Sequence, residues 1–352
     1  MSIYETQAST DADHAASAEP STTVQSLSTS TRERFARAGI VGELQALEDL
    51  LLARTASHSA YIAAAGAHTV QAGGKRLRAA LALLASRLRG TSHTEQALHT
   101  AASVELIHAA SLVHDDLVDH TRRRRGRVTV HALWDNDVAL MVGDYFFALA
   151  AAEMALCRDP RIITYYAQAV QTIVEGELNP VTTVEPLDSA LQQYLYKTGA
   201  KTATLFAAGC KAGMATGGGS EDDIAALGHY GYDLGVAFQI VDDVLDFIGD
   251  EKTLGKPAGN DLREGTITLP LMYAVEQSRS DFLRDIAGVS GLSDEQVAQA
   301  IAEVKQAGAI ERTQQEARAY VERAVAHLNH FAESPARQTM IELAWFVIQR
   351  QT

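Results

Sequence analysis

Two short acidic segments carry residues whose types and spacing suit metal binding. DDLVD begins at Asp115 and DDVLD begins at Asp242. On a helix, Asp119 would lie one turn from Asp115, and Asp246 one turn from Asp242, on a shared face. Such like-charged pairs destabilise an isolated helix by about 0.2–0.5 kcal/mol and call for a cation, and carboxylate oxygens suit Mg²⁺. One such segment alone would equally fit an ordinary acidic helix end. Two matched copies, each after an apolar stretch, favour metal sites.

Basic residues supply the charge that an anionic substrate would need. Arginines 122–125 follow the first acidic segment, and GGKRLR places Lys75 and Arg78 at a predicted helix start, where free N–H groups favour an anion. Lys201 and Lys256 lie further along the chain. Each element alone is more often surface charge. Together with the two acidic segments they predict a substrate that carries diphosphate groups.

Composition limits the function classes. The 352 residues are 47% hydrophobic, enough for a large core. A net charge of −14 argues against nucleic acid as the main partner, and so against reading the four arginines as a DNA-binding patch. Cys157 and Cys210 are too few and too far apart for a disulfide framework or a zinc site. They predict buried thiols in a reducing compartment, and we expect a cytoplasmic protein.

The chain divides into a tail and one helical domain. Residues 1–31 are rich in Ser, Thr and Ala and resemble neither a secretory signal nor a transit peptide, so we expect a disordered tail. Residues 32–352 are rich in Ala and Leu without sustained period-2 alternation, which predicts a single all-α domain of about 10–14 helices. The most apolar run, Val138–Ala152, is interrupted by Asp144, and a transmembrane span is not expected. Helix breaks are expected at residues 73–74, 89–90, 126, 160, 179–180, 217–219 and 249–265.

The order of these motifs resembles that of the trans-prenyltransferases, the polyprenyl synthetase family. GGKRLR, IHAASLVHDDLVD with RRRRG, KTATLF, FQIVDDVLDF and GKPAGNDLREGTITLPL follow one another between Gly73 and Pro270, and ARQTMIELAWFVIQR resembles the family's closing helix. The resemblance implies an all-α bundle of the type I isoprenoid synthase fold around a central cavity, usually a homodimer. It implies condensation of isopentenyl diphosphate with an allylic diphosphate, and at most transient membrane contact for product release.

The resemblance also implies a role for each matched residue. Three Mg²⁺ ions would be held by Asp115, Asp119, Asp242 and, in support, Asp246, with Asp116 and Asp243 behind them. The allylic diphosphate would be contacted by Arg124, Lys201, Thr202, Gln239 and Lys256. The diphosphate of isopentenyl diphosphate would be held by Lys75, Arg78, His108 and Arg125. The implied catalytic set is Asp115, Asp119, Arg124, Lys201, Asp242 and Lys256. Arg122 and Arg123 fall outside the matched pair, and we expect them at the surface.

The chemistry agrees with these charges. Ionisation of the allylic C–O bond leaves a cation and a diphosphate, whose negative charge Mg²⁺, Arg and Lys would stabilise. The departing diphosphate is the expected base in this family. His108 would be a core histidine in most proteins, but it lies seven residues before Asp115 on the same helix face, which favours the ligand role.

Product length depends on the residues one turn below the first acidic segment. Ala110 and Ser111 stand five and four residues before Asp115, and both are small. An aromatic side chain there would stop chain growth early, whereas the small pair leaves space toward Ile107 and Val104. We expect a product longer than farnesyl and longer than geranylgeranyl diphosphate, with a geranylgeranyl synthase as the alternative.

Three departures from the family pattern stand out. Thr266 replaces the lysine that usually follows Glu-Gly in the last motif, and Pro180 replaces a polar residue and is expected to kink its helix. Lys197-Thr198 duplicates Lys201-Thr202 one turn earlier.

Two rival functions also stay open. A terpene cyclase would not need Lys75 or an isopentenyl site, and a non-catalytic subunit of a heteromeric synthase would usually have a degraded acidic segment.

Overall fold

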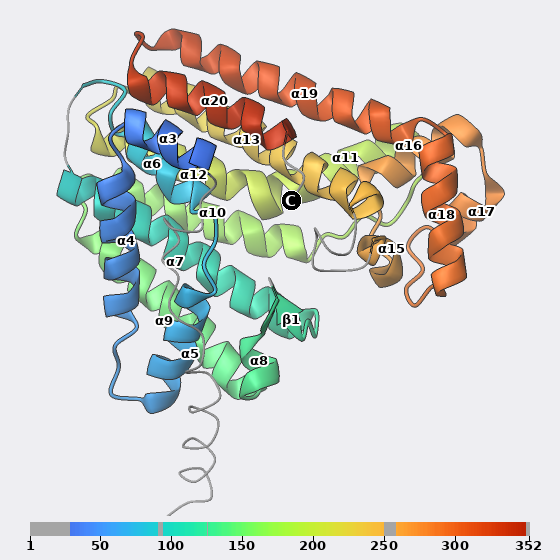
Figure 1. The fold of residues 1–352 in the computed structure, drawn as a ribbon, viewed down its shortest axis with the longest axis horizontal. Coiled ribbons are helices and arrows are strands. Elements are labelled where there is room, and N and C mark those ends of the chain that lie inside the picture. The colour runs from blue at the N-terminus through green and yellow to red at the C-terminus, as the bar shows by residue number, and fades with distance from the viewer. Residues whose placement is uncertain (1–28, 91–93, 125, 250–257, 350–352) are drawn as a thin grey trace, which may run out of the picture. The chain divides into compact units, whose positions relative to one another are not determined.

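The computed structural model describes residues 29–90, 94–124, 126–249 and 258–349 (Figure 1). Within these ranges the chain forms 17 α-helices, one π-helical segment and one 3₁₀ turn, and its only strands are a two-residue hairpin pair. The all-α expectation is confirmed. The helices outnumber the expected 10–14 because short ones of four to six residues, such as α8 (Val130–Leu133) and α15 (Asn260–Glu264), lie between the long ones.

The chain forms two compact units, and each is described by itself. The first comprises residues 1–164, 212–220 and 334–339. Its central helix is α7, which is buried on every side from Thr100 to Ile107 and runs beside α9 (Figure 1). Around this pair the unit contains α3 (Thr29–Arg37), α4 (Val41–Arg54), α5 (Ala60–Gln71), α6 (Leu77–Ala85), α7 (Thr94–Val118), β1 (Arg123–Arg124), β2 (Arg127–Val128), α8 and α9 (Asn136–Ala155).

The second unit comprises residues 165–211, 221–333 and 340–352. Its central helix is the 28-residue α13, whose main neighbour is α19 (Figure 1). Three helices, α10, α12 and α20, have residues in both units. The elements are α10 (Arg161–Glu177), α11 (Leu187–Thr198), the π-helical segment Gly199–Ala203, α12 (Thr204–Thr216), α13 (Glu221–Ile248), α15, α16 (Leu269–Ser278), α17 (Asp281–Ile286), α18 (Asp294–Gln306), α19 (Ala309–His327), the 3₁₀ turn Leu328–His330 and α20 (Pro335–Gln349).

The first helix corrects the expected tail boundary. Residues 1–28 lie outside the described ranges, but Thr29–Thr31 belong to α3 rather than to a disordered tail. Thr31 is buried, and the Phe35 side chain of the same helix is fully buried. The buried face of α3 therefore starts at Thr31, before the boundary that composition suggested.

The proline expectation was also wrong in its detail. Helix α10 does not kink at Pro180; it ends at Glu177, two residues before Asn179. The Asn179 side chain donates a hydrogen bond to the carbonyl oxygen of Glu175 at 2.6 Å, which satisfies one of the last carbonyls of the helix. Pro180 therefore follows a helix end and disturbs no interior hydrogen bond.

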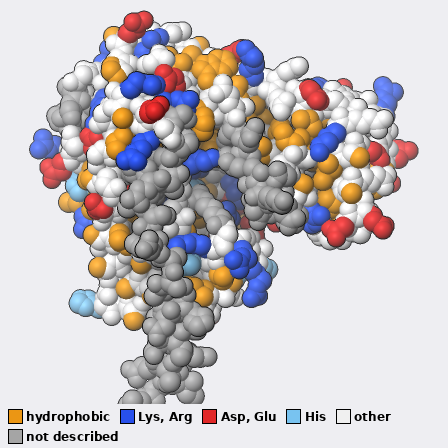
Figure 2. All heavy atoms as spheres, in the orientation of Figure 1, with side chains coloured by type: hydrophobic (Ala, Val, Ile, Leu, Met, Phe, Trp, Pro, Cys, Tyr) orange, Lys and Arg blue, Asp and Glu red, His pale blue; other side chains and the backbone are white. Residues whose placement is uncertain are grey.

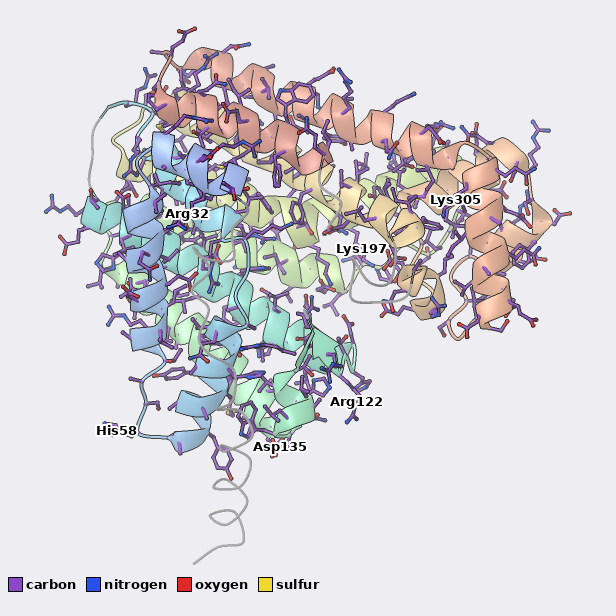
Figure 3. The ribbon with its side chains drawn as sticks, in the orientation of Figure 1. Arg32, His58, Arg122, Asp135, Lys197 and Lys305 are labelled. Carbon is purple, nitrogen blue, oxygen red and sulfur yellow. The ribbon has the colours of Figure 1, made fainter. Side chains whose placement is uncertain are left out.

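Helix α9 is the one described helix that is long and apolar enough to cross a membrane by length and composition. Its Asp135 N-cap accepts a hydrogen bond from the backbone N–H of Val138 at 2.7 Å (Figure 3). One side of α9 packs on α7, with Phe146 fully buried. Its other side leaves Leu140 and Met141 exposed, so that only a third of the apolar window is covered.

Candidate active site

The first acidic segment occupies the C-terminal end of α7. Asp115 is half-buried and Asp119 is exposed, one residue beyond the helix end at Val118. The backbone N–H of Asp119 still donates to the carbonyl oxygen of Asp115 at 2.8 Å, so the helical spacing extends to both aspartates. The two carboxylates therefore lie about one turn apart and accessible, as the spacing predicted.

Asp116 has a different environment from its neighbours. It is buried and accepts a hydrogen bond at 2.7 Å from Nε of Arg124. Burial raises the pKa of the Asp116 carboxyl, although the Arg124 guanidinium opposes that shift. The backbone N–H of Thr121 also donates to the Asp116 carbonyl oxygen at 2.9 Å. Asp116 thus ties the arginine hairpin to the end of α7.

The hairpin presents the remaining arginines at the surface. Strand β1 pairs with β2 in the register Arg123 with Val128 and Arg124 with Arg127. Arg122 and Arg123 are exposed, as expected, and Arg122 lies at the outer edge of the hairpin (Figure 3). Lys and Arg side chains gather over this region of the first unit (Figure 2). Arg125, which the resemblance assigned to isopentenyl diphosphate, lies outside the described residues.

The GGKRLR segment forms a sharp turn before α6. Gly73 and Gly74 have φ values of 66° and 158°, which glycine adopts without strain, and Arg76 takes a left-handed conformation with φ of 44°. Helix α6 then begins at Leu77, so the predicted helix start is confirmed. Lys75 is exposed before the helix, and Arg78 lies half-buried in its first turn.

Arg76 fixes this turn from the inside. Its side chain is 10% exposed, and it donates to Glu48 of α4 at 2.7 Å and to Glu105 of α7 at 3.3 Å. Burial disfavours the charged guanidinium, but Glu105 and Glu48 outweigh that effect and raise the pKa of Arg76. Glu105 also accepts from the backbone N–H of Ala79 at 3.1 Å, which satisfies a free donor of α6. Motif spacing gave no indication of this role for Arg76.

The other predicted residues of the first unit share α7. His108 is half-buried, and Ala110 and Ile107 are buried. Ser111 is half-buried, and its hydroxyl donates to the carbonyl oxygen of Ile107 at 3.1 Å. A Cβ added at Gly143 of α9 would lie 2.1 Å from the ring of His114, so glycine lets α9 approach α7 closely beside the acidic segment.

The second acidic segment lies within α13. Asp242 is half-buried, whereas Asp243 is fully buried. Asp243 accepts hydrogen bonds from the Tyr194 hydroxyl at 2.6 Å and from Nε2 of Gln239 at 3.0 Å. Burial raises the pKa of the Asp243 carboxyl to about 7, against the two hydrogen bonds that lower it. Of these two aspartates, only Asp242 is accessible to a ligand.

Asp246 combines the expected position with a structural contact. It lies one turn after Asp242 on α13 but is 1% exposed. Its Oδ2 accepts from the backbone N–H of Asp261 at 3.0 Å, and its carbonyl oxygen accepts from Gly259 at 2.7 Å. Asp246 therefore satisfies free N–H groups at the start of α15. Its role toward a metal stays a prediction.

The KTATLF motif, residues 201–206, begins in the π-helical segment Gly199–Ala203 and continues into α12. Nζ of Lys201 pairs with Glu177 of α10 at 2.6 Å, and the Thr202 hydroxyl donates to Oε1 of Gln239 at 2.9 Å. Lys197 lies one turn earlier, on α11 (Figure 3). Such wide turns inside helices are frequent at functional sites. The duplicated Lys-Thr pair gave no sequence signal for the π turn.

The glycines around the π-helical segment explain how it packs. A Cβ at Gly235 of α13 would lie 2.5 Å from Cα of Ala203, and a Cβ at Gly176 of α10 would lie 2.5 Å from Cβ of Ala200. Both glycines therefore allow their helices to approach the wide turn. Lys256, predicted to contact the allylic diphosphate, lies outside the described residues.

A metal centre is not preassembled in the described part of the chain. No group of three His, Cys, Asp or Glu side chains lies close enough there to hold an ion. Of the predicted metal ligands, Asp115 and Asp119 form an accessible pair at the C-terminal end of α7, and the half-buried Asp242 lies on α13, in the other unit. Their oxygens are the donors that Mg²⁺ prefers, so the donor chemistry fits this ion.

Comparison with known proteins identifies the family. The polyprenyl synthetase family model matches residues 59–304. Component 2 of the heptaprenyl diphosphate synthase of Geobacillus stearothermophilus is 38% identical over 309 residues, covering 88% of this chain and 96% of that protein. Two solved structures match with TM-scores of 0.85 and 0.83. They are a polyprenyl synthase from Caulobacter crescentus complexed with calcium and isoprenyl diphosphate (35% identity, 91% of this chain and 98% of that chain) and a decaprenyl diphosphate synthase from Rhodobacter capsulatus (36%, 91% and 99%).

The chain therefore belongs to the polyprenyl synthetase family, and it is a trans-prenyltransferase. The resemblance inferred from the motifs is confirmed. The roles of individual residues stay predictions, because the similarity holds over the sequence and the fold and assigns no role to a single residue.

Proposed function

We propose that this prenyltransferase condenses isopentenyl diphosphate with an allylic diphosphate to a product longer than geranylgeranyl diphosphate. The observation that carries the length is the small pair below the first acidic segment. Ala110 is buried and has only a methyl side chain, and the Ser111 hydroxyl donates a hydrogen bond to the carbonyl oxygen of Ile107. Neither side chain is large enough to block a growing chain. Relatives named for heptaprenyl and decaprenyl products support this proposal.

The accessible carboxylates are proposed to hold Mg²⁺, three ions with substrate bound. Asp115, Asp119 and Asp242 offer oxygens that solvent can reach, and the Caulobacter relative is described with calcium and isoprenyl diphosphate. Bound Mg²⁺ would supply positive charge to the diphosphate that leaves the allylic substrate. Asp246 would support this set from its buried position on α13, where its Oδ2 accepts from the N–H of Asp261.

The basic and polar side chains that the resemblance names are proposed to bind the two diphosphates. Lys75, Arg78 and His108 would hold the diphosphate of isopentenyl diphosphate, which keeps its double bond oriented toward the allylic carbon. Lys201 and Arg124 would contact the allylic diphosphate; in the substrate-free chain each is held by a carboxylate, Glu177 and Asp116. Such preorganised cations stabilise the developing negative charge without reorganisation.

Substitution of Ser111 tests the product length. Wild-type protein, isopentenyl diphosphate carrying a radiolabel, an allylic primer and Mg²⁺ should give linear products longer than geranylgeranyl after dephosphorylation. Ser111→Phe should shorten them, because the ring would occupy the turn below Asp115. Unchanged product lengths would place the limiting residue elsewhere, and cyclic hydrocarbons from the primer alone would indicate a terpene cyclase.

We propose that the chain acts as a homodimer in the cytoplasm. The uncovered side of α9, on which Leu140 and Met141 are each more than 40% exposed, supports a second copy as the partner. The name of the Geobacillus relative, component 2, favours a different chain as the alternative partner. Two free cysteines, Cys157 half-buried and Cys210 buried, agree with a reducing compartment. The mass of the purified chain in solution separates the two partners.

A further inference from the structure

A chain of three buried or half-buried hydrogen bonds leads from α11 to the KTATLF motif. The Tyr194 hydroxyl donates to Oδ2 of Asp243 at 2.6 Å. The other carboxyl oxygen, Oδ1, accepts from Nε2 of Gln239 at 3.0 Å, one turn earlier on α13. Oε1 of Gln239 accepts from the Thr202 hydroxyl at 2.9 Å. All four residues belong to the second unit, and Tyr194 and Asp243 are each 3% exposed.

Each bond in this chain fixes the direction of the next group. An amide side chain has one accepting and one donating end, so the bond to Asp243 turns the oxygen of Gln239 toward Thr202. Asp243 has this orientation because Tyr194 occupies its second oxygen. Burial, and next the charge of Asp243, raise the pKa of the Tyr194 hydroxyl well above 10, so the phenol keeps its proton and stays a donor.

Removal of the Tyr194 hydroxyl would disturb the far end of the chain. Oδ2 of Asp243 would become a buried acceptor without its donor, a loss of about 1–3 kcal/mol for such groups. The Asp243 carboxyl would then rotate toward another donor, and this rotation alters its bond to Gln239. Gln239 and Thr202 would then lose the directions in which the folded chain holds them.

We propose that Tyr194 is a positioning residue for the allylic substrate, acting through Asp243 on Gln239 and Thr202. This inference rests on the proposed function and on the family resemblance, which implies that Gln239 and Thr202 contact the allylic diphosphate. Tyr194 acts through its hydrogen bond to Asp243 and makes no substrate contact of its own. Its hydroxyl sets the orientation of the Gln239 and Thr202 side chains at the allylic diphosphate. Lys75, Arg78 and His108 belong to the other unit and are unaffected.

Tyr230 provides a matched control that distinguishes a positioning role of Tyr194 from a purely structural one. Tyr230 is also a fully buried tyrosine, and its hydroxyl donates to the carbonyl oxygen of Met340 at 2.9 Å. Tyr194→Phe and Tyr230→Phe each remove one buried hydroxyl and one hydrogen bond. Both should lower the thermal unfolding midpoint by a similar amount, so stability alone does not distinguish them.

Steady-state kinetics provide the test. In Tyr194→Phe, the KM for the allylic diphosphate should rise about tenfold, which corresponds to about 1.4 kcal/mol, while the KM for isopentenyl diphosphate stays within about twofold. In Tyr230→Phe both KM values should match the wild type. Asp243→Asn should reproduce the Tyr194→Phe pattern. An unchanged allylic KM in Tyr194→Phe, or equal rises for both substrates, would overturn the proposal.

A binding measurement keeps the proposal independent of turnover. The probe is a thiolodiphosphate, an allylic diphosphate whose bridging oxygen is replaced by sulfur so that the allylic bond does not ionise. Its dissociation constant, measured by titration in the presence of Mg²⁺, should be about tenfold higher for Tyr194→Phe than for the wild type. If the wild-type protein binds the analogue but forms no product from the substrates, the proposed function is contradicted. The affinities of the wild type and Tyr194→Phe for the analogue can still be compared. Equal affinity of wild type and Tyr194→Phe for the analogue would contradict the positioning role alone.

Discussion

At the scale of single residues, Arg76 combines a strained backbone with a buried charge. Its left-handed conformation disfavours any residue other than glycine by about 1–2 kcal/mol, and its guanidinium lies between Glu48 and Glu105. The neighbouring Lys75 and Arg78 are the residues proposed to hold isopentenyl diphosphate. The ion pairs of Arg76 therefore stabilise the fold and also keep a binding turn in one conformation.

Arg76→Met should remove both effects. The buried Glu105 and the half-buried Glu48 would each lose the arginine as a partner, and breaking a buried pair lowers the free energy of unfolding by about 3–5 kcal/mol. The KM for isopentenyl diphosphate should rise several-fold because the turn that carries Lys75 loses its anchor. Urea unfolding and steady-state kinetics measure the two results. Arg87→Met, which breaks the half-buried pair with Glu43 outside this turn, is the control.

Arg87→Met should cost stability without a change in the KM for isopentenyl diphosphate. If Arg76→Met and Arg87→Met had the same KM, the turn would hold its conformation without Arg76. A normal unfolding midpoint for Arg76→Met would contradict the stabilising role of the two ion pairs.

The aspartates show what spacing predicts and what it does not. The one-turn separation of Asp115 and Asp119 follows from helix geometry and is seen in the structure. The burial of Asp116 and Asp243 depends on Arg124 and Tyr194, which lie eight and forty-nine residues away. Identical residue types in matched motifs therefore gave no indication of which carboxylates stay accessible.

At the scale of elements, the π-helical segment Gly199–Ala203 depends on close backbone approach. Helix α13 passes it at Gly235, where a side chain would press on Cα of Ala203. The segment carries Lys201 and Thr202, so the packing of two helices sets the position of two proposed substrate contacts. Glycine at this position permits the close approach of the two backbones.

Gly235→Ala should destabilise the protein and impair the allylic site. The added Cβ would lie 2.5 Å from backbone, and overpacking of this kind costs about 1–3 kcal/mol. We expect a lower thermal unfolding midpoint and a higher KM for the allylic diphosphate. Gly228→Ala on the same helix is the control, because its Cβ would meet Cε of the long Lys211 side chain, which can move aside.

If Gly235→Ala and Gly228→Ala had the same thermal unfolding midpoint, the π-helical segment would adapt to the extra Cβ atom. The structural argument would then be wrong at this position, whatever the kinetics. A midpoint that falls only in Gly235→Ala agrees with the backbone contact at Ala203.

Helix positions were largely predictable, and their ends were less so. Glycine pairs and prolines marked the breaks after α5, α10 and α12, where the structure has them. The effect of Pro180 was misjudged because Asn179 already satisfies a carbonyl at the end of α10. The short hairpin at Arg123–Val128 was not predicted, since two-residue strands carry no periodic pattern.

At the scale of the whole molecule, the uncovered side of α9 predicts self-association. Met141 is 53% exposed, so Met141→Asp should leave the fold intact while placing a charge in an apolar interface. Light scattering should give twice the chain mass for the wild type and a smaller mass for the variant. Leu52→Asp, at a 42% exposed position on α4, should remain dimeric. A monomeric wild type would instead favour a different partner chain.

The initial rate of prenyl transfer measures most directly whether this chain alone condenses the two diphosphates. Purified wild-type protein with Mg²⁺, labelled isopentenyl diphosphate and an allylic diphosphate should form linear polyprenyl diphosphates. Asp115→Asn and Asp242→Asn, one in each unit, should each reduce the rate by several orders of magnitude while leaving the unfolding midpoint unchanged. No product from the wild type in the absence of another chain would contradict the account.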